Sequence, residues 1–480
     1  MATTVAEKQA YPLWIGGEPV RTGTVRTVTL PYDGSFVADV CEADKSTFDR
    51  AIAAARQGAR AMAALTLYER AALLDRIRDL LARDEQAFAR DIASETGKPI
   101  REARVEASRS QLTLQASADA ARSLHGEAIP MEAAPTGKGR WAMTVREPLG
   151  VVGAITPFNF PLNLALHKIG PALAAGNSVI HKPSENTPLS ALRLASIVAE
   201  AGAPAGAVNV IPGAGETVGD WIVSDSRVDM LTFTGSIPVG QQIRAKAGLR
   251  RVALELGNNS SLIVEPDADL EPLIPRCVTG SFSHSGQVCI SVQNIYLQER
   301  IAPEFTERFV AAARKLKIGH PMDDQTEVSS LINTEAAERV ELWIEQARRA
   351  GSRVLTGGAR RGATIEPTIL DRVDPHLDVC CKEVFGPVVA LHTYKDLGDA
   401  IAQVNSGQYG LQVGVCTANL SRAFQAARSL EFGGVILNDV PAYRVDHMPY
   451  GGAKNSGIGR EGPRYAIEEM TEMKLVCWKV

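Results

Sequence analysis

The feature that most constrains this sequence is a regular alternation of short apolar stretches and longer helical stretches between residues 151 and 247. The predicted strands are Val151 to Ile155, Ser178 to His181, Val208 to Ile211 and Met230 to Phe233. Each is followed by a stretch with helical periodicity. Strands that are apolar throughout and separated by helices are typical of a parallel sheet covered on both faces. This half of the chain is therefore predicted to bind a ligand at the carboxyl ends of its strands.

A second alternation follows residue 255. Its predicted strands are Ser261 to Val264, Val292 to Leu297, Val388 to Tyr394, Val413 to Thr417 and Val435 to Asn438. Helical stretches separate them, and no internal repeat links the two halves. Because 480 residues are long for a single core, two large domains are the natural expectation. The predicted fold class is α/β, with two parallel-sheet α/β domains.

The remaining segments predict smaller features. Tyr11 to Val40 alternates around turn signals, which indicates short strands or hairpins, and Ser46 to Leu124 reads as helix with a break at Thr96 to Pro99. Ala128 to Gly139 is interpreted as a loop or the start of an arm. The final apolar strand, Lys474 to Val480, has nothing after it to cover it, so we expect it to pair with another subunit.

Composition excludes several classes of protein. Lys and Arg total 51 against 55 Asp and Glu, which gives a net charge of -4 and no positive field for nucleic acid or an anionic membrane. No run of about 18 apolar residues is present, and the stretch from Met1 to Ala10 shows no targeting signal. The 7 cysteines lack CxxC spacing and the 8 histidines lack zinc spacing. Reduced thiols, a cytoplasmic location and no metal are expected.

The stretch from Glu255 to Cys289 holds the first candidate reactive groups. Glu255 follows a strand-like stretch, and Cys289 follows Gly286, Gln287 and Val288 in a polar loop that breaks a helical pattern. A cysteine with a carboxylate from a neighbouring element suits a thiol nucleophile with a base. A small core residue is the commoner role of a cysteine. That is our interpretation of Cys41, Cys277, Cys416 and Cys477, whereas Cys380 and Cys381 are predicted to be partly exposed.

Three loops carry further candidates, each of which also has an ordinary structural explanation. Asn159, between aromatic residues and prolines, could cap its own loop or donate to an oxyanion. The segment from Phe233 to Gly240 could receive a pyrophosphate at a helix start or be a simple turn. Lys182 and Glu185 follow a strand and could bind ribose hydroxyls or be a solvated pair.

Taken together, these residues resemble the NAD(P)-dependent aldehyde dehydrogenase superfamily over nearly the whole chain. The motifs that carry the resemblance, in chain order, are Phe158-Asn159-Phe160-Pro161, Lys182-Pro183-Ser184-Glu185, Phe233-Thr234-Gly235-Ser236, Glu255-Leu256-Gly257, Gly286-Gln287-Val288-Cys289, Glu383-Val384-Phe385-Gly386-Pro387 and Pro449-Tyr450-Gly451-Gly452. The region from Glu431 to Lys474 is most similar to the branch of lactaldehyde dehydrogenases and non-phosphorylating glyceraldehyde-3-phosphate dehydrogenases.

The resemblance implies an aldehyde-dehydrogenase-like fold with a small β oligomerisation arm. It implies an NAD-binding domain at residues 1-124 and 142-255, a catalytic domain at 256-448, and an arm at 125-141 and 460-480. A homodimer or homotetramer is expected, with NAD as cofactor and NADP possible. The cofactor-binding residues it implies are Ile155, Thr156, Pro157, Phe158, Lys182, Ser184, Glu185, Gly215, Phe233, Thr234, Gly235, Ser236, Val239, Leu256, Gly257, Glu383 and Phe385.

The resemblance also implies the catalytic roles. Cys289 would attack the aldehyde, the Asn159 amide and the Cys289 N–H would hold the oxyanion, and Glu255 would activate the water that hydrolyses a thioester. Lys182 and Glu185 would hold the adenosine ribose, Gly235 and Ser236 the pyrophosphate, and Glu383 with Phe385 the nicotinamide riboside.

The implied substrate pocket departs from the pattern of relatives that act on phosphorylated aldehydes. Those relatives place an arginine before the cysteine, where this chain has Val288, whereas Arg109 matches a second arginine that they use. A small uncharged or hydroxylated aldehyde such as lactaldehyde is therefore expected, with Phe160 and Ile290 also in the pocket. Arg444 and His447 could bind a carboxylate or sulfonate tail, or be surface charges at a subunit contact.

Several alternatives stay open at this point. They are a semialdehyde or a sulfonated or phosphonated aldehyde as substrate, a coenzyme-A-acylating dehydrogenase, a phosphorylating semialdehyde reductase, and a catalytically silent binding or structural relative. Glu255 argues against coenzyme A because a hydrolytic base is present. Asn159, Glu255 and Cys289 together argue against a silent protein.

Overall fold

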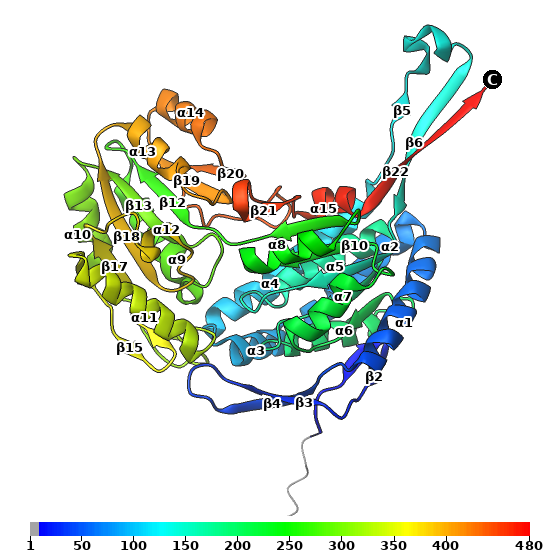
Figure 1. The fold of residues 1–480 in the computed structure, drawn as a ribbon, viewed down its shortest axis with the longest axis horizontal. Helices are drawn as coiled ribbons and strands as arrows, with labels where there is room; N and C mark the ends of the chain where they lie inside the picture. Colours follow the sequence, from blue (N-terminus) through cyan, green and yellow to red (C-terminus); the bar gives the residue numbers. More distant parts are fainter. Residues whose placement is uncertain (1–8) are drawn as a thin grey trace, which may run out of the picture.

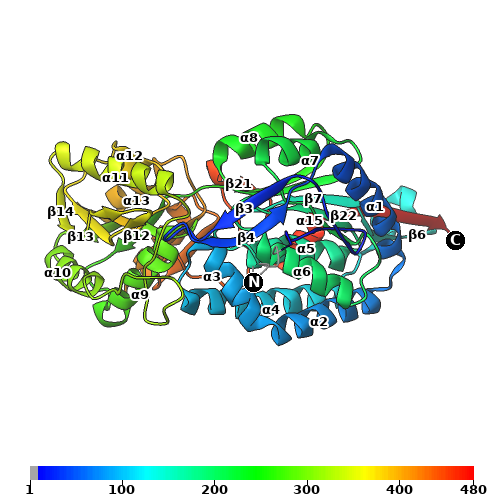
Figure 2. The ribbon, with the colours of Figure 1, turned by 90° about the horizontal axis from the view of Figure 1, so that it is seen from below.

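The computed structural model describes residues 9–480 and consists of two α/β domains side by side, with a narrow arm that projects from one of them (Figure 1). The first eight residues, where no targeting signal is expected, lie outside the described range. The hairpin of β3 (Val25–Thr29) and β4 (Phe36–Cys41) runs from the first domain toward the second, and Figure 2 shows it from below. Tyr32, at its tip, lies 5.2 Å from the ring of His320 in the second domain.

The first domain is built on an 8-stranded sheet with the order β2-β1-β9-β8-β7-β10-β11-β21. The strands are β2 (Glu18–Val20), β1 (Leu13–Ile15), β9 (Val208–Val210), β8 (Ser178–Lys182), β7 (Val151–Ile155), β10 (Met230–Thr234), β11 (Arg251–Glu255) and β21 (Gly457–Ile458). The five central strands from β9 to β11 are parallel, which confirms the prediction, whereas β1, β2 and β21 add antiparallel edges.

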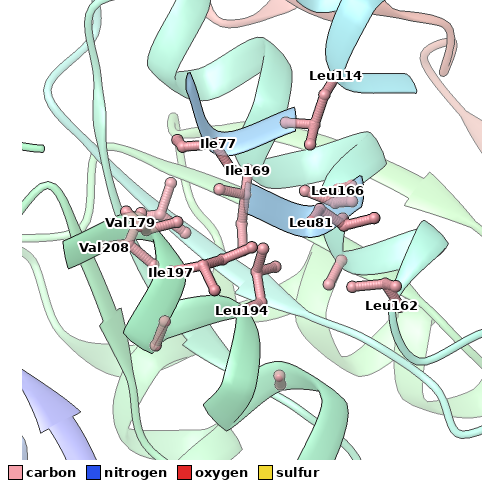
Figure 3. Packing of buried hydrophobic residues seen from close by; sticks show 14 of the residues in the cluster. Ile77, Leu81, Leu114, Leu162, Leu166, Ile169, Val179, Leu194, Ile197 and Val208 are labelled. Carbon is pink, nitrogen blue, oxygen red and sulfur yellow. The ribbon is translucent and has the colours of Figure 1, made fainter. Parts of the chain in front are cut away.

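Helices cover both faces of this sheet. They are α1 (Lys45–Ala64), α2 (Leu67–Arg83), α3 (Glu85–Thr96), α4 (Ile100–Arg122), α5 (Asn163–Ala175), α6 (Leu189–Glu200), α7 (Asp220–Ser224), α8 (Ile237–Lys246) and α15 (Pro463–Glu469). Alternate residues of a strand point to opposite faces. Val152 of β7 thus packs with α2 to α6, and Val151 packs with α1 and α7. Figure 3 shows part of the first of these cores.

Local sequence sets the helix ends. Asp44 and Thr66 begin α1 and α2 with capping boxes, which satisfy N–H groups that have no partner within a helix. Gly97 ends α3 with a φ of 71°, a left-handed conformation that glycine adopts without strain. The helical break expected at Thr96 to Pro99 is confirmed.

The second domain contains a 7-stranded sheet with the order β14-β17-β18-β13-β12-β19-β20. Its strands are β14 (Arg353–Thr356), β17 (Thr368–Asp371), β18 (Val388–Tyr394), β13 (Val292–Gln298), β12 (Ser260–Val264), β19 (Gln412–Cys416) and β20 (Gly434–Leu437). Its helices are α9 (Leu270–Phe282), α10 (Ala302–Ala313), α11 (Thr334–Arg349), α12 (Asp378–Cys381), α13 (Leu397–Asn405) and α14 (Leu420–Ser429). All pairs are parallel except β14 with β17, as the second alternation predicted.

The arm is a 3-stranded sheet of β22 (Thr471–Lys479), β6 (Arg140–Pro148) and β5 (Ala128–Ile129) (Figure 1). The expected arm boundaries, 125-141 and 460-480, differ from this. The strand β6 continues to Pro148, beyond residue 141. Helix α15 buries Ala466 and Ile467 in the first domain, so within residues 460-480 only β22 belongs to the arm.

The partner of the final strand also differs from expectation. It pairs with β6 of the same chain over nine positions, from Thr471 opposite Pro148 to Lys479 opposite Arg140, and keeps one edge open. Cys477 lies on this strand and is exposed rather than buried, because a two-sided ribbon has no core. Of the pair in α12, Cys380 is buried and Cys381 is exposed, while Cys41, Cys277 and Cys416 are buried as predicted. Within residues 9–480, no helix is both long and apolar enough to cross a membrane.

Candidate active site

Most of the predicted cofactor residues lie along one edge of the first sheet. Because β8, β7, β10 and β11 are parallel neighbours, the loops that follow them meet at their shared carboxyl edge. These loops hold Ile155 to Phe158, Lys182 to Glu185, Phe233 to Ser236, and Leu256 with Gly257. Gly215 opens a helical turn after β9 on the same side, and Val239 lies in the first turn of α8.

The connection from β10 to α8 has the properties of a phosphate site. Ser236 precedes the helix without capping it through its side chain, so the first N–H groups of α8 stay free. Pro238 lies in the first turn, where the N–H that proline lacks would have no partner within the helix. The Thr234 Oγ1 atom is buried and has no hydrogen-bond partner among the described residues. Free donors and an unpaired hydroxyl beside a helix N-terminus fit the pyrophosphate of a dinucleotide.

Charged and aromatic groups flank this edge. Lys182 is buried, its Nζ donates to the Pro183 carbonyl at 2.8 Å, and it lies 3.5 Å from the Glu185 carboxylate. Burial lowers the pKa of Lys182, and Glu185 opposes that shift. Glu383, from the second domain, accepts a hydrogen bond from the Asn258 N–H at 2.9 Å, and burial raises its pKa to about 7.

Phe158 and Phe385 contact each other across the domain boundary. Their ring centroids are 5.8 Å apart in an edge-to-face arrangement, a geometry that the quadrupoles of aromatic rings favour. Phe385 has a left-handed backbone with a φ of 50°. The two domains therefore bring the Phe158 and Glu383 motifs, which are distant in sequence, to the same cleft.

Cys289 follows a strained turn that begins where α9 ends. His284 and Ser285 have φ values of 48° and 54°, and a side chain on Gly286 would clash with the carbonyl oxygen of Gly386. The Cys289 Sγ atom is 2.8 Å from the Tyr450 Oη. Burial raises the pKa of Cys289 to about 11, and the Tyr450 hydrogen bond opposes that shift.

Asn159 reaches the cysteine loop from the first domain. Its Nδ2 donates to the Gln287 carbonyl at 2.9 Å, which leaves the second amide proton available. The backbone after it is fixed by Glu106 of α4, whose Oε1 accepts hydrogen bonds from the N–H groups of Leu162 and Asn163. The amide of Asn159 is thus held against the segment that carries the thiol.

Glu255 ends β11 and is buried at the domain junction. Its Oε2 atom has no hydrogen-bond partner among the described residues. Burial raises the pKa of Glu255 well above its usual value, and the neighbouring Glu461 carboxylate adds to that rise. Glu461 is itself held by Lys168 at 3.1 Å and by Arg444 at 3.0 Å. A buried carboxyl with a free oxygen and a raised pKa accepts a proton more readily than an ordinary carboxylate does.

A cavity of about 360 Å³ opens onto the thiol. Five of the predicted pocket residues line it together with Cys289, namely Arg109, Phe160, Val288, Ile290 and Arg444. His447 is exposed and lies outside the lining of this cavity. The reason is that the loop turns there and directs its neighbour Asp446 inward instead.

The two arginines of the cavity that the sequence singled out, Arg109 and Arg444, are both paired with acidic residues. Arg109 donates to Asp446 through Nε at 3.2 Å and Nη2 at 2.9 Å, so its charge is balanced internally. Arg444 pairs with Glu461 and lies over the ring of Tyr450, with 3.7 Å from the guanidinium carbon to the ring centroid. Its Nε is buried without a partner in the described chain.

Sequence reasoning missed several residues of this site. Tyr450 was recognised only as part of a motif, and Lys168, Asp446 and Glu461 were not singled out. Lys168 was detectable as a cation within an otherwise apolar helix, and Glu461 follows a glycine-rich loop. Nothing local in the sequence distinguishes Asp446 or assigns a partner to Tyr450.

Comparison with known proteins agrees with this geometry. The family model described as "Aldehyde dehydrogenase family" matches residues 19–476. A 3-sulfolactaldehyde dehydrogenase of Priestia aryabhattai is 47% identical over 99% of each chain, and a lactaldehyde dehydrogenase of Methanococcus aeolicus is 38% identical over 97% of this chain and 99% of its own. Glyceraldehyde-3-phosphate dehydrogenase GapN from Methanocaldococcus jannaschii, solved with NADP, superposes with a TM-score of 0.91 at 40% identity and covers 96% of this chain and 100% of its own. With the motifs and the fold in agreement, the chain belongs to the aldehyde dehydrogenase family.

Proposed function

We propose that this enzyme oxidises a small 2-hydroxy aldehyde of the lactaldehyde type to the carboxylic acid, with Cys289 as nucleophile. The observation that carries the proposal is the convergence of three groups from both domains. The Cys289 thiol lines the cavity, the Asn159 amide contacts the cysteine loop, and Glu255 keeps an unpaired carboxyl oxygen at the junction.

The first half-reaction uses the thiol and the amide. The ionised Sγ of Cys289 forms a bond to the aldehyde carbon, and the carbonyl π electrons move to the oxygen. The free amide proton of Asn159 and the backbone N–H of Cys289 donate to that oxyanion. A nicotinamide dinucleotide held by the loops at the sheet edge would supply the acceptor for the hydride that leaves the same carbon, which would leave a thioester on Cys289.

The second half-reaction uses Glu255. Its carboxylate accepts a proton from water while the water oxygen forms a bond to the thioester carbon, the C–S bond breaks, and the acid leaves with Cys289 restored as thiolate. The raised pKa of Glu255 suits this role because the carboxyl then gains a proton readily. Burial alone would raise the pKa of the adjacent Glu461. The positive charges of Lys168 and Arg444 outweigh that effect, so the pKa of Glu461 is lowered and its carboxyl stays an anion.

The walls of the cavity favour a short substrate. Apolar surface beside the thiol comes from Phe160, Val288 and Ile290. The positive charge of Arg109 is compensated by its ion pair with Asp446. Without an arginine immediately before the cysteine, a doubly charged phosphate has no dedicated partner there. We therefore expect a higher kcat/KM for lactaldehyde than for glyceraldehyde 3-phosphate.

A second candidate substrate is lactaldehyde that carries a sulfonate. Arg444 lines the cavity beside Tyr450, and its positive charge could attract the singly charged tail of such a substrate. The 3-sulfolactaldehyde dehydrogenase of Priestia aryabhattai is consistent with this candidate. Both candidates share a three-carbon 2-hydroxy aldehyde and differ only in the terminal group.

Steady-state kinetics separate these candidates. The purified protein is assayed with NAD or NADP against lactaldehyde, 3-sulfolactaldehyde, succinate semialdehyde and glyceraldehyde 3-phosphate, with and without coenzyme A or phosphate. The highest kcat/KM on glyceraldehyde 3-phosphate would refute the substrate proposal. Cys289→Ala should abolish turnover while dinucleotide still binds, and retained turnover would remove Cys289 from its role.

Three further properties form part of the proposal. Glu185 disfavours the 2′-phosphate of NADP by charge repulsion, so NAD should be preferred. All seven cysteines are unpaired, which suits a reducing, cytoplasmic setting. The open edge of β22, with Trp141, Leu475 and Trp478 exposed on the arm, suits a homodimer or homotetramer. Light scattering coupled to size exclusion measures the oligomeric state.

A further inference from the structure

The side chain of Tyr450 lies directly against the nucleophile. Its Oη is 2.8 Å from Cys289 Sγ and is the one hydrogen-bond partner of that sulfur within residues 9–480. Tyr450 is 2% exposed. We propose that Tyr450 is a further catalytic residue, whose phenol donates a hydrogen bond to the Cys289 thiolate and holds it ready for attack. The inference rests on the proposed function, because it takes Cys289 as the nucleophile.

The surroundings of Cys289 explain why the thiolate needs such a donor. The apolar side chains of Val288 and Ile290 pack beside it. The carboxyl groups of Glu255 and Glu383 also disfavour a second negative charge there. A thiol reacts as the thiolate, so some group must offset burial and these two carboxyls. Tyr450 and the positive charge of Arg444 are the groups that do so.

Tyr450 is well suited to remain a donor. Burial raises its pKa well above the usual value, so the phenol keeps its proton over the working pH range. When the Cys289 thiol ionises, its proton passes to a base or to water, and the phenol turns its own proton toward sulfur. When sulfur then bonds to the aldehyde carbon, the charge moves to the oxyanion and the phenol is released unchanged.

The position of Tyr450 is fixed from two sides. Its backbone N–H donates to the Glu461 carbonyl at 3.0 Å, and the Glu461 N–H donates back at 2.6 Å. The Arg444 guanidinium covers the ring at 3.7 Å and is tied to the Glu461 carboxylate. A cation over the ring face draws electron density from the phenol. The hydroxyl is thereby held at the sulfur as a strengthened donor.

Tyr450→Phe tests the proposal because it removes one oxygen and keeps the packing. The rate of Cys289 alkylation by iodoacetamide is measured from roughly pH 7 to pH 10, below the raised pKa of this thiol, where the rate follows the small thiolate fraction, and each cysteine is followed by peptide mass spectrometry. Loss of the phenol donor should raise the pKa of Cys289 by about one unit, so alkylation at each of these pH values slows about tenfold. The exposed Cys381 serves as an internal control and should react as in the wild type.

A matched control is Tyr443→Phe, the same substitution at an exposed position of the same loop, which should leave the Cys289 profile unchanged. A second readout is the pre-steady-state burst of reduced cofactor, which should also slow about tenfold in Tyr450→Phe. An unchanged alkylation profile and an unchanged burst would overturn the role of Tyr450. Retained turnover in Cys289→Ala would instead overturn the proposed function, so the two failures are distinct.

Discussion

Replacing Lys98 by methionine should leave a carboxylate buried without its counter-charge. Lys98 and Glu106 form an ion pair in which both side chains are 1% exposed, and the Lys98 Nζ lies 3.8 Å from the centroid of the Phe160 ring. Glu106 also accepts the N–H groups of Leu162 at 3.1 Å and Asn163 at 3.2 Å. The substitution removes the cation and keeps the anion with its two backbone donors.

The expected loss follows from these contacts. Breaking a buried pair by removing one partner costs about 3–5 kcal/mol. The two backbone N–H groups still donate to the Glu106 carboxylate, so we expect the loss of stability to lie near the lower end of this range. The lost contact between the cation and the Phe160 ring adds about 1 kcal/mol. Methionine retains the apolar stem of the lysine, so little cavity forms. We expect the free energy of unfolding to fall by about 3–4 kcal/mol.

Urea unfolding, followed by fluorescence at one fixed protein concentration, measures this loss. Adding Glu106→Gln to Lys98→Met removes the uncompensated charge and should restore about 1–2 kcal/mol. Lys45→Met is the matched control, because Lys45 pairs with Asp49 at the surface, where such a pair contributes less than about 1 kcal/mol. A loss in Lys98→Met no larger than in the control would refute the reasoning.

Three further predictions follow from the site. Glu255→Gln should give one burst of reduced cofactor and then stall in stopped-flow absorbance, because acylation depends less on this base than hydrolysis does; a full steady-state rate would identify another base. Dinucleotide affinity, measured by calorimetry, should rise as pH increases through about 7, where Glu383 ionises and becomes a better acceptor for ribose hydroxyls; Glu383→Gln should remove that dependence. Val288→Arg should raise kcat/KM for glyceraldehyde 3-phosphate relative to lactaldehyde, and an unchanged ratio would contradict the role of Val288 in excluding phosphate.

Much of the fold was predictable because it depends on local patterns. The strands β7, β8 and β10 are short, apolar and separated by helices, and that pattern admits few arrangements other than a parallel sheet. Once the strands are parallel, the loops after them must share one edge, so the candidate cofactor loops could be placed together. The edges of the sheet were less predictable, because β21 has only two residues and no periodicity to detect.

The arm shows the limit of such reasoning. The apolar sequence of the last strand indicates that it pairs with another strand, but it does not identify that strand. The structure pairs β22 with β6, more than three hundred residues earlier, as in the bond between Lys474 and Glu147 at a separation of 327. The same limit applies at the site. Asp446 is buried and its neighbour His447 is exposed, because the turn of the loop directs the two side chains to opposite sides.

The sequence by itself determined the chemistry that this protein can perform. The reactive groups can be recognised from short sequence motifs. They are a cysteine in a glycine-bearing loop, a carboxylate at a strand end and an asparagine between prolines. Only the tertiary structure decided how that chemistry is supported. Tyr450 reaches Cys289 across 161 positions, and the Glu461 carboxylate meets Lys168 across 293. Contacts between residues so far apart in the chain form only when the complete fold brings their elements together, and no short-range pattern in the sequence encodes them.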